Sequence, residues 1–272
     1  MKNWLNDKTI ILTGASSGIG KEMCRLLITH YGANIIGVGR SEEKMLALKK
    51  ELKDYANKFT YQIFDVSIKA EWEQFAQRLQ NNHVCVTLLI NNAGIFPSFQ
   101  STSEVLIDTI EKTMETNFYS AVYATQMLNP LIPTNKTSGI INICSSAALC
   151  TIAGTAPYSA SKSALKAYTE ALMIEERQKY IGIIYPGTTA TELFRNDIQT
   201  QNSALDKIAM PAPKMAKKII QKIYKRKKRA VVGWDAKLMN ITAKIAPIKG
   251  PQLIRSVMHK SKSKVFKNVF KD

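Results

Sequence analysis

Short apolar segments recur along most of the chain and alternate with longer amphipathic stretches. The segments are rich in β-branched residues and cover residues 9–12, 34–38, 60–64, 86–90, 139–143 and 181–185. Apolar runs of this length predict strands that are buried on both faces, and the stretches between them predict helices. Strands and helices that alternate in this way are typical of an α/β fold. We therefore expect a doubly wound parallel sheet with helices on both faces.

The length of the chain suits one complete domain. It has 272 residues, of which 45% are hydrophobic, and we favour one large α/β domain over two small ones. The four cysteines lack CxxC spacing and the density of a disulfide scaffold, so we expect reduced structural thiols in a cytosolic protein and no metal site. The N-terminal residues do not form a signal peptide, and no apolar run reaches the roughly 20 residues of a membrane span.

Positive charge is concentrated at the C-terminal end. Residues 1–206 contain 19 Lys and Arg against 19 Asp and Glu, whereas residues 207–272 contain 19 Lys and Arg against Asp235 and Asp272. The net charge of +17 therefore lies entirely in the last quarter of the chain. A cationic segment of this kind indicates either an anionic partner or a solvated surface.

A glycine-rich loop follows the first predicted strand. In a doubly wound sheet, ligands bind beyond the carboxyl ends of the strands, and "TGASSGIG" stands at that position before a helical stretch. Glycine allows the backbone to turn tightly and approach a pyrophosphate, which the amides of a helix N-terminus can bind. The alternative is a plain turn between strand and helix. The candidate cofactor residues of this loop are Gly14, Ser16, Ser17, Gly18, Ile19 and Gly20.

The residues after the second strand indicate which dinucleotide binds. An acidic residue there would bind the ribose of NAD, but the chain has Arg40 and Ser41, with Lys44 nearby. An arginine forms charge-assisted hydrogen bonds with a 2′-phosphate, so we infer NADP(H) and consider NAD(H) less favoured. The alternative is a solvated Arg40 beside loosely bound NAD.

Two further strand ends carry candidate cofactor residues. After the third strand, Asp65 and Val66 could contact the adenine, and Asp65 could equally be the N-cap of a helix that begins near Ile68. After the fourth strand, Asn92, Ala93 and Gly94 are small enough to let the cofactor ribose approach, although such a sequence is also an ordinary turn.

Tyr158 and Lys162 form a candidate proton-transfer pair. They are four residues apart in "YSASK", where a helix begins, so both side chains lie on one face of that helix. The pKa of a free phenol, about 10, is too high for ready proton exchange at neutral pH. The ammonium and the oxidised nicotinamide together would lower it toward the working pH. The alternative is an ordinary surface contact.

Five motifs occur in the same order as in one known family. With "TGASSGIG", "NNAG", Ser145, "YSASK" and "YPGTTAT", the chain resembles the short-chain dehydrogenase/reductase family over about residues 5–195. The resemblance implies a Rossmann-type fold and reversible hydride transfer between NADP(H) and a carbonyl or secondary alcohol. It also implies a homodimer or homotetramer. Some members of the same fold catalyse isomerisation or dehydration, and a non-catalytic NADP-binding scaffold or redox sensor is the alternative from another functional class.

The resemblance also implies roles for single residues. Ser145, which lies 13 positions before the tyrosine, would bind the substrate carbonyl, and Tyr158 would exchange the proton. Lys162 would bind the ribose and lower the tyrosine pKa, and the backbone of Asn117 would hold a water of a proton relay. The family's PGxxxT segment, which holds the nicotinamide carboxamide, corresponds to Pro186, Gly187, Thr189 and Thr191.

The family places a substrate lid at about residues 192–213. Five of its residues are apolar and suggest a lipophilic substrate such as a keto-lipid, a steroid or a 3-oxoacyl compound, although they could equally be core contacts. They are Leu193, Phe194, Leu205, Ile208 and Met210. The catalytic domain would then cover residues 1–213.

Residues 214–272 are expected to form a basic, amphipathic, helical extension. Leu238, Ile241 and Ile245 share one helix face, and Lys237 and Lys244 lie outside it. Such a helix could place residues 214–260 at an anionic membrane, which would make a cytoplasmic protein peripheral. A solvated or oligomer-forming extension is an alternative. Nucleic acid is the least favoured partner, because aromatic residues are sparse in this segment.

Overall fold

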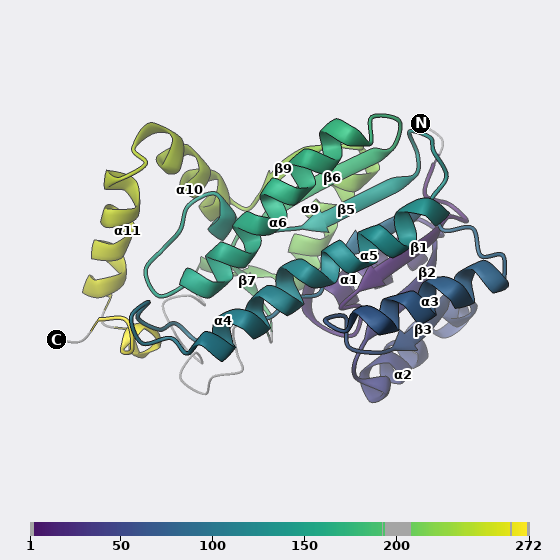
Figure 1. The fold of residues 1–272 in the computed structure, drawn as a ribbon, viewed down its shortest axis with the longest axis horizontal. Helices are drawn as coiled ribbons and strands as arrows, with labels where there is room; N and C mark the ends of the chain where they lie inside the picture. Colours follow the sequence, from purple (N-terminus) through teal and green to yellow (C-terminus); the bar gives the residue numbers. More distant parts are fainter. Residues whose placement is uncertain (1–2, 192, 194–207, 262, 271–272) are drawn as a thin grey trace.

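Seven parallel strands form the central sheet. The computed structural model describes residues 3–191, 193, 208–261 and 263–270. The strand order is β3-β2-β1-β4-β5-β6-β9, and every neighbouring pair is parallel (Figure 1). The strands are β1 (Thr9–Thr13), β2 (Asn34–Gly39), β3 (Phe59–Ile63), β4 (Leu88–Asn91), β5 (Gly139–Ile143), β6 (Tyr180–Pro186) and β9 (Arg229–Val232). The predicted doubly wound sheet is confirmed.

Helices cover both faces of this sheet. The helices are α1 (Gly18–Thr29), α2 (Glu42–Glu51), α3 (Lys69–Asn81), α4 (Ile107–Met114), α5 (Ser120–Leu128), α6 (Ala156–Glu175), α9 (Ala212–Tyr224), α10 (Trp234–Ile245) and α11 (Lys249–Lys260). Single turns lie at η1 (Lys53–Lys58), η2 (Glu115–Tyr119), η3 (Asn129–Leu131), η4 (Ser146–Ala148) and η6 (Lys264–Phe266). Two short strands, β7 (Thr189–Ala190) and β8 (Met210–Pro211), pair with each other in parallel.

The core consists of two layers, one on each side of the sheet. Because successive side chains of a strand point to opposite faces, Ile10 and Leu12 pack into one layer and Ile11 packs into the other. The first layer is closed by α1, α2 and α9, and the second by α3, α5 and α6, which cover the near face in Figure 1. This arrangement leaves the carboxyl ends of the strands as the place where a ligand can bind.

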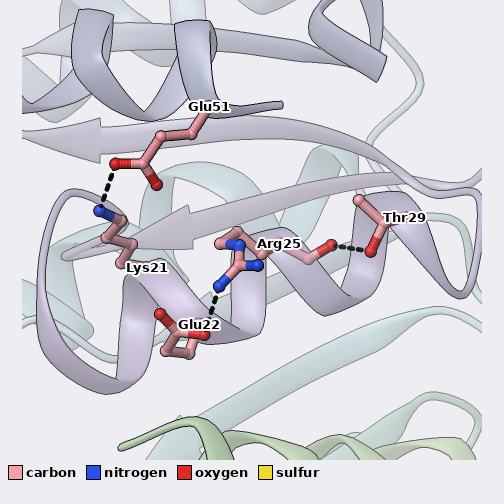
Figure 2. Close-up of polar contacts among 5 residues, drawn as sticks. All are labelled: Lys21, Glu22, Arg25, Thr29 and Glu51. Atoms are coloured by element: carbon pink, nitrogen blue, oxygen red, sulfur yellow. Dashed lines mark hydrogen bonds and ion pairs between the residues drawn. The ribbon is translucent and has the colours of Figure 1, made fainter. Parts of the chain in front are cut away.

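The outer side of α1 is polar and contacts α2. Lys21 Nζ lies 2.8 Å from Glu51 Oε1, and Arg25 pairs with Glu22 one turn away (Figure 2). Exposed ion pairs of this kind stabilise a fold only slightly. The orientation of α1 is therefore determined mainly by its buried side, where Met23, Leu27 and Ile28 reach the core.

The predicted extension of residues 214–272 begins inside the core. Helix α9 packs against α1, and β9 continues the sheet beside β6. Only after β9 does the chain leave the sheet, as α10 and α11, at one end of the molecule (Figure 1). The final residues then fold back, where Phe266 packs against Phe99. Every helix in the described ranges is too short or too polar to cross a bilayer.

Candidate active site

A cavity of about 540 Å³ lies at the carboxyl ends of the strands. It brings together residues that are far apart in the sequence, from the glycine-rich loop to α10. The predicted site residues that line it are Gly14, Ser16, Ser17, Gly18, Ile19, Gly20, Arg40, Ser41, Asn92, Ala93, Gly94, Ser145, Tyr158, Lys162, Pro186, Gly187, Thr189 and Thr191. Asn117, Asp65 and Val66 are not part of its wall.

The glycine-rich loop requires its glycines for two physical reasons. Gly14 and Gly18 have φ angles of +66° and +51°, a region that other residues rarely adopt. At Gly20, an added Cβ would lie 2.0 Å from the carbonyl oxygen of Gly14. Helix α1 starts directly at this loop, and its N-cap residue Ser17 makes no side-chain capping bond. The first amides of α1 can therefore bind an anion.

Thr13 was not predicted from the sequence, yet it joins two strand ends of the site. Its hydroxyl oxygen accepts hydrogen bonds from the backbone amides of Asn92 and Ala93, both at 2.9 Å. The side chain of Asn92 donates in return to the backbone oxygen of Thr13 at 3.0 Å. A hydroxyl residue that ends an otherwise apolar strand just before the glycine loop is the signal that could have revealed this role.

Arg40, which lines the cavity, lies beside Asp65. Arg40 Nη1 is 3.7 Å from Asp65 Oδ2, and the arginine side chain is 68% exposed. Asp65 Oδ1 accepts hydrogen bonds from the amide and hydroxyl of Ser67. Burial opposes ionisation of Asp65, but the Ser67 hydrogen bonds and the charge of Arg40 outweigh it and lower the pKa of the carboxyl. Asp65 is thus not the predicted N-cap, because α3 begins at Lys69 after Ile68.

Tyr158 and Lys162 lie on α6 and line the cavity, and both are buried. Lys162 Nζ lies 5.9 Å from the centre of the Tyr158 ring and donates to the backbone oxygen of Ile143 at 3.3 Å. Ser145 comes from the loop after β5 and lines the same cavity as Tyr158. The predicted pairing on one helix face, with the serine beside it, is present.

Asn117 lies behind the cavity wall and forms hydrogen bonds with residues next to the site. It lies in a π-helical turn between α4 and α5, and only 1% of it is exposed. Its side-chain oxygen accepts from the amide of Ile95 at 2.7 Å, and its nitrogen donates to the Ile95 carbonyl at 2.9 Å and to Ser161 Oγ at 3.0 Å. π-Helical turns often occur at functional sites because they alter backbone hydrogen bonding.

Burial dominates the ionisation of the central pair in the protein alone. It raises the pKa of Tyr158 to about 12, although the Ser145 hydrogen bond acts in the opposite direction. It also lowers the pKa of Lys162, whereas the charge of the Cys144 thiolate would raise it. The predicted lowering of the tyrosine pKa is therefore not a property of the chain by itself. The reason is that desolvation disfavours both charged forms.

The cofactor loop after β6 is held by a residue that was not predicted. Asp235, at the start of α10, accepts a hydrogen bond from the Thr188 amide at 2.6 Å and is 9% exposed. It lies so close to Gly187 that a Cβ added there would be 2.1 Å from Asp235 Oδ1. An acidic residue that stands alone between many lysines was the available signal.

Apolar side chains from several segments also line the cavity. Of the predicted lid residues, Leu193 lines it, whereas Met210 packs against the main core and Ile208 is exposed. Phe194 and Leu205 lie outside the described residues. Larger apolar side chains of the lining that the sequence did not indicate include Phe96, Phe99, Ile152 and Met239.

Comparisons with known proteins agree with this geometry. The sequence profile described as short chain dehydrogenase matches residues 8–202. The chain belongs to the short-chain dehydrogenase/reductase family. It is accordingly an oxidoreductase that acts on CH–OH and C=O groups. The match covers the first six strands of the sheet and the helices between them, whereas α9 and β9 lie beyond it.

Several relatives within this family are similar over most of the chain. The mouse protein named dehydrogenase/reductase SDR family member 7B is 30% identical over 240 residues, which cover 84% of this chain and 73% of the relative. The 3-dehydrosphinganine reductase of Danio rerio is 30% identical over 72% of this chain and 61% of its own length. A solved structure described as a short chain dehydrogenase of Shigella flexneri, complexed with NADP, superposes with a TM-score of 0.76 at 25% identity. That superposition covers 87% of this chain and 100% of the solved one.

Proposed function

We propose that this enzyme is an NADP(H)-dependent reductase or dehydrogenase for a lipophilic ketone or secondary alcohol. The observation that carries the proposal is the arrangement around the buried Tyr158. It lines one cavity together with Ser145 and Lys162, its ring centre lies 5.9 Å from Lys162 Nζ, and apolar side chains line the same cavity. A site of this kind can transfer a proton to an oxygen atom and at the same time exclude water from it.

The preference for NADP(H) is supported by the residues at the polar end of the cavity. Arg40, Ser41 and Lys44 line this end, and an arginine can hold a 2′-phosphate through charge-assisted hydrogen bonds. The glycine-rich loop fits a pyrophosphate, because its backbone approaches closely and α1 begins there. When bound, the cofactor supplies or accepts the hydride. Solved relatives crystallised with NADP or NADPH also support this assignment.

The chain's own residues would orient the reactants and manage the proton. Ser145 would donate a hydrogen bond to the substrate oxygen, and Tyr158 would give its proton to that oxygen during reduction. Lys162 would hold the cofactor ribose and favour the tyrosinate that forms. Pro186, Gly187, Thr189 and Thr191 would hold the nicotinamide end of the cofactor. Asn117 would keep the Ile95 backbone and Ser161 in place.

The apolar end of the cavity supports a lipophilic substrate. Phe96, Phe99, Ile152, Leu193 and Met239 line the same cavity as Tyr158, and the Phe96 ring lies 5.1 Å from the Tyr158 ring. Relatives named for reduction of sphingoid ketones point in the same direction. The predicted homodimer or homotetramer and the predicted membrane association stay predictions.

The decisive experiment is Tyr158→Phe, with Tyr168→Phe on the same helix as the matched control. Tyr168 is half-buried and is not part of the cavity wall. NADPH oxidation with a panel of soluble and lipophilic ketones should fall at least about 10²-fold in Tyr158→Phe, the usual contribution of a general acid. NADPH binding, measured by fluorescence titration, should be retained. Near-normal turnover in Tyr158→Phe would refute the proposed role and favour the non-catalytic scaffold.

The cofactor preference has a separate test in Arg40→Ala. A charge-assisted hydrogen bond to the 2′-phosphate contributes about 1.5–3 kcal/mol of binding free energy. Its loss should therefore lower kcat/KM for NADPH by roughly 10- to 100-fold. The value for NADH should be nearly unchanged, because NADH has no 2′-phosphate. Lys21→Ala removes a cation of the neighbouring helix that pairs with Glu51, and it serves as the control. An equal loss for both cofactors would argue against a specific contact with the phosphate.

A further inference from the structure

Helices α10 and α11 expose an unusual amount of apolar surface. Seven large apolar side chains of residues 234–257 are more than half exposed: Trp234, Leu238, Ile241, Ile245, Ile248, Leu253 and Val257. We call this set the outer apolar face. Within α10 its members recur at intervals of three and four residues, which places them along one side of the helix. Exposed apolar side chains in this number on two neighbouring helices are typical of an interaction site in a soluble protein.

Positively charged side chains lie on the same two helices as the outer apolar face. Residues 234–260 contain Lys237, Lys244, Lys249, Arg255 and Lys260, and all five are exposed. The only acidic residue of this stretch is Asp235, which is buried against Thr188. The outside of the two helices is therefore apolar and positively charged at the same time. On α10, Lys237 and Lys244 flank the apolar row on one side.

The inner side of α10 is part of the active site. Asp235 holds the Thr188 amide, Ala236 is fully buried, and Met239 lines the cavity. The helix thus separates the apolar end of the cavity from the outer apolar face. In Figure 1, α10 and α11 lie together at one end of the molecule, away from β2 and β3. A surface that binds the outer face would lie one helix away from the substrate.

We propose that the outer apolar face docks into the headgroup region of an anionic lipid bilayer. An amphipathic helix with apolar residues, a tryptophan and flanking lysines is suited to this location. Anionic lipids complement the cations, and each nearby Lys or Arg strengthens the attachment. A second copy of the chain fits less well, because a two-fold contact would place the same cationic surface against itself. The chain's excess charge of +17 lies in residues 207–272, which include both helices.

Docking would bring the apolar end of the cavity close to substrates dissolved in the bilayer. This consequence rests on the proposed activity toward lipophilic carbonyls, whereas the docking itself does not. The two ideas can therefore fail separately. Vesicle binding tests the docking, and turnover of a soluble ketone tests the enzyme.

The experiment is flotation of the full chain with phosphatidylcholine vesicles that contain or lack phosphatidylserine. The wild type should float with the anionic vesicles at least about tenfold better than with the neutral ones, and the difference should shrink at high salt. Leu238→Ser with Ile241→Ser should reduce flotation about tenfold. Leu46→Ser with Ile174→Ser is the matched control, because it removes two exposed aliphatic side chains elsewhere, and it should float normally.

A second measurement guards against loss of folding in the variants. Trp234 is 59% exposed, so its fluorescence should shift to the blue when anionic vesicles are added, and Trp234→Phe should abolish that shift. Turnover of a soluble ketone should be unchanged in Leu238→Ser with Ile241→Ser. Equal flotation with both vesicle types, or wild-type flotation of this variant, would overturn the proposal. Conversion of a dimer to a monomer by the same variant, without vesicle binding in the wild type, would also overturn it and assign the face to a second copy.

Discussion

Helices α9 and α10 come from the same basic part of the chain, yet they use their apolar residues in opposite ways. Met215, Ile219 and Ile223 of α9 are fully buried against α1 and the sheet, and its lysines face solvent. In α10 the apolar row is exposed, and the opposite side, with Asp235 and Met239, serves the cavity. An amphipathic pattern therefore reveals that one side of a helix is apolar, but the surrounding fold decides whether this side is buried.

The largest difference between the two helices is expected in their contribution to stability. Ile219→Ala should lower the free energy of unfolding by about 2–5 kcal/mol, because it leaves a cavity in the core. Ile241→Ala removes the same atoms from an exposed position and should change it by less than about 0.5 kcal/mol. Urea unfolding followed by circular dichroism measures both values. Equal destabilisation would mean that Ile241 is covered in the folded protein.

The inner side of α10 should matter for catalysis more than for folding. Asp235→Ala removes the acceptor of the Thr188 amide and should cost about 1–3 kcal/mol, which corresponds to a roughly 5- to 150-fold lower kcat/KM for the cofactor. Asp235→Asn retains an oxygen acceptor and should recover part of the loss. Steady-state kinetics with varied NADPH provides the measurement. A similar loss in both variants would show that the negative charge, and not the hydrogen bond, is required.

Alkaline pH offers a third test, because it acts on Tyr158, which lines the same cavity as Met239 of α10. Burial raises the pKa of Tyr158 to about 12, whereas in the unfolded chain a tyrosine loses its proton near pH 10. Between these values the unfolded state binds fewer protons than the folded state. The free energy of unfolding should therefore fall by up to about 1.4 kcal/mol per pH unit from this group. Tyr158→Phe should show a shallower decline over the same interval, and an identical slope would contradict the assignment.

The smallest expected effect concerns the cations of the two helices. Lys217→Gln with Lys218→Gln on α9, and Lys237→Gln with Lys244→Gln on α10, replace exposed side chains. Each pair should change the free energy of unfolding by less than about 0.5 kcal/mol. Only the α10 pair should weaken flotation with anionic vesicles, by about tenfold. If both pairs weaken flotation equally, the attraction is a property of the net charge and not of the outer apolar face.

Local sequence patterns predicted part of the polar lining of the cavity, and the resemblance to the family supplied the rest. The glycine-rich loop and the helix that carries Tyr158 and Lys162 each depend on a few neighbouring residues, whereas Ser145 and the residues after β6 were implied by the family motifs. A parallel sheet then brings all strand ends to one edge, so their proximity follows from the fold class. The N-cap alternative for Asp65 was wrong, because its side chain closes a turn with Ser67 and α3 begins only after Ile68, whereas its contact with the adenine stays a prediction.

Contacts between distant segments could not be derived in this way. The apolar lining joins Phe96 and Phe99 to Met239, and the brace on the cofactor loop joins Asp235 to Thr188. Each of these residues has an unremarkable local pattern, so only the path of the chain makes them neighbours. For the same reason, the sequence did not predict that the core continues beyond residue 213. Helix α9 and β9 return to the sheet after a segment that carries no strand signal.

The sequence by itself determined the first six strands of the sheet, the helices between them and the glycine-rich loop, because periodicity, glycine conformation and helix spacing act over a few residues. The tertiary structure alone decided which residues form the apolar end of the cavity and which side of α10 faces outward. It also decided the ionisation of Tyr158, because desolvation depends on all the atoms that surround a group and not on its neighbours in the chain.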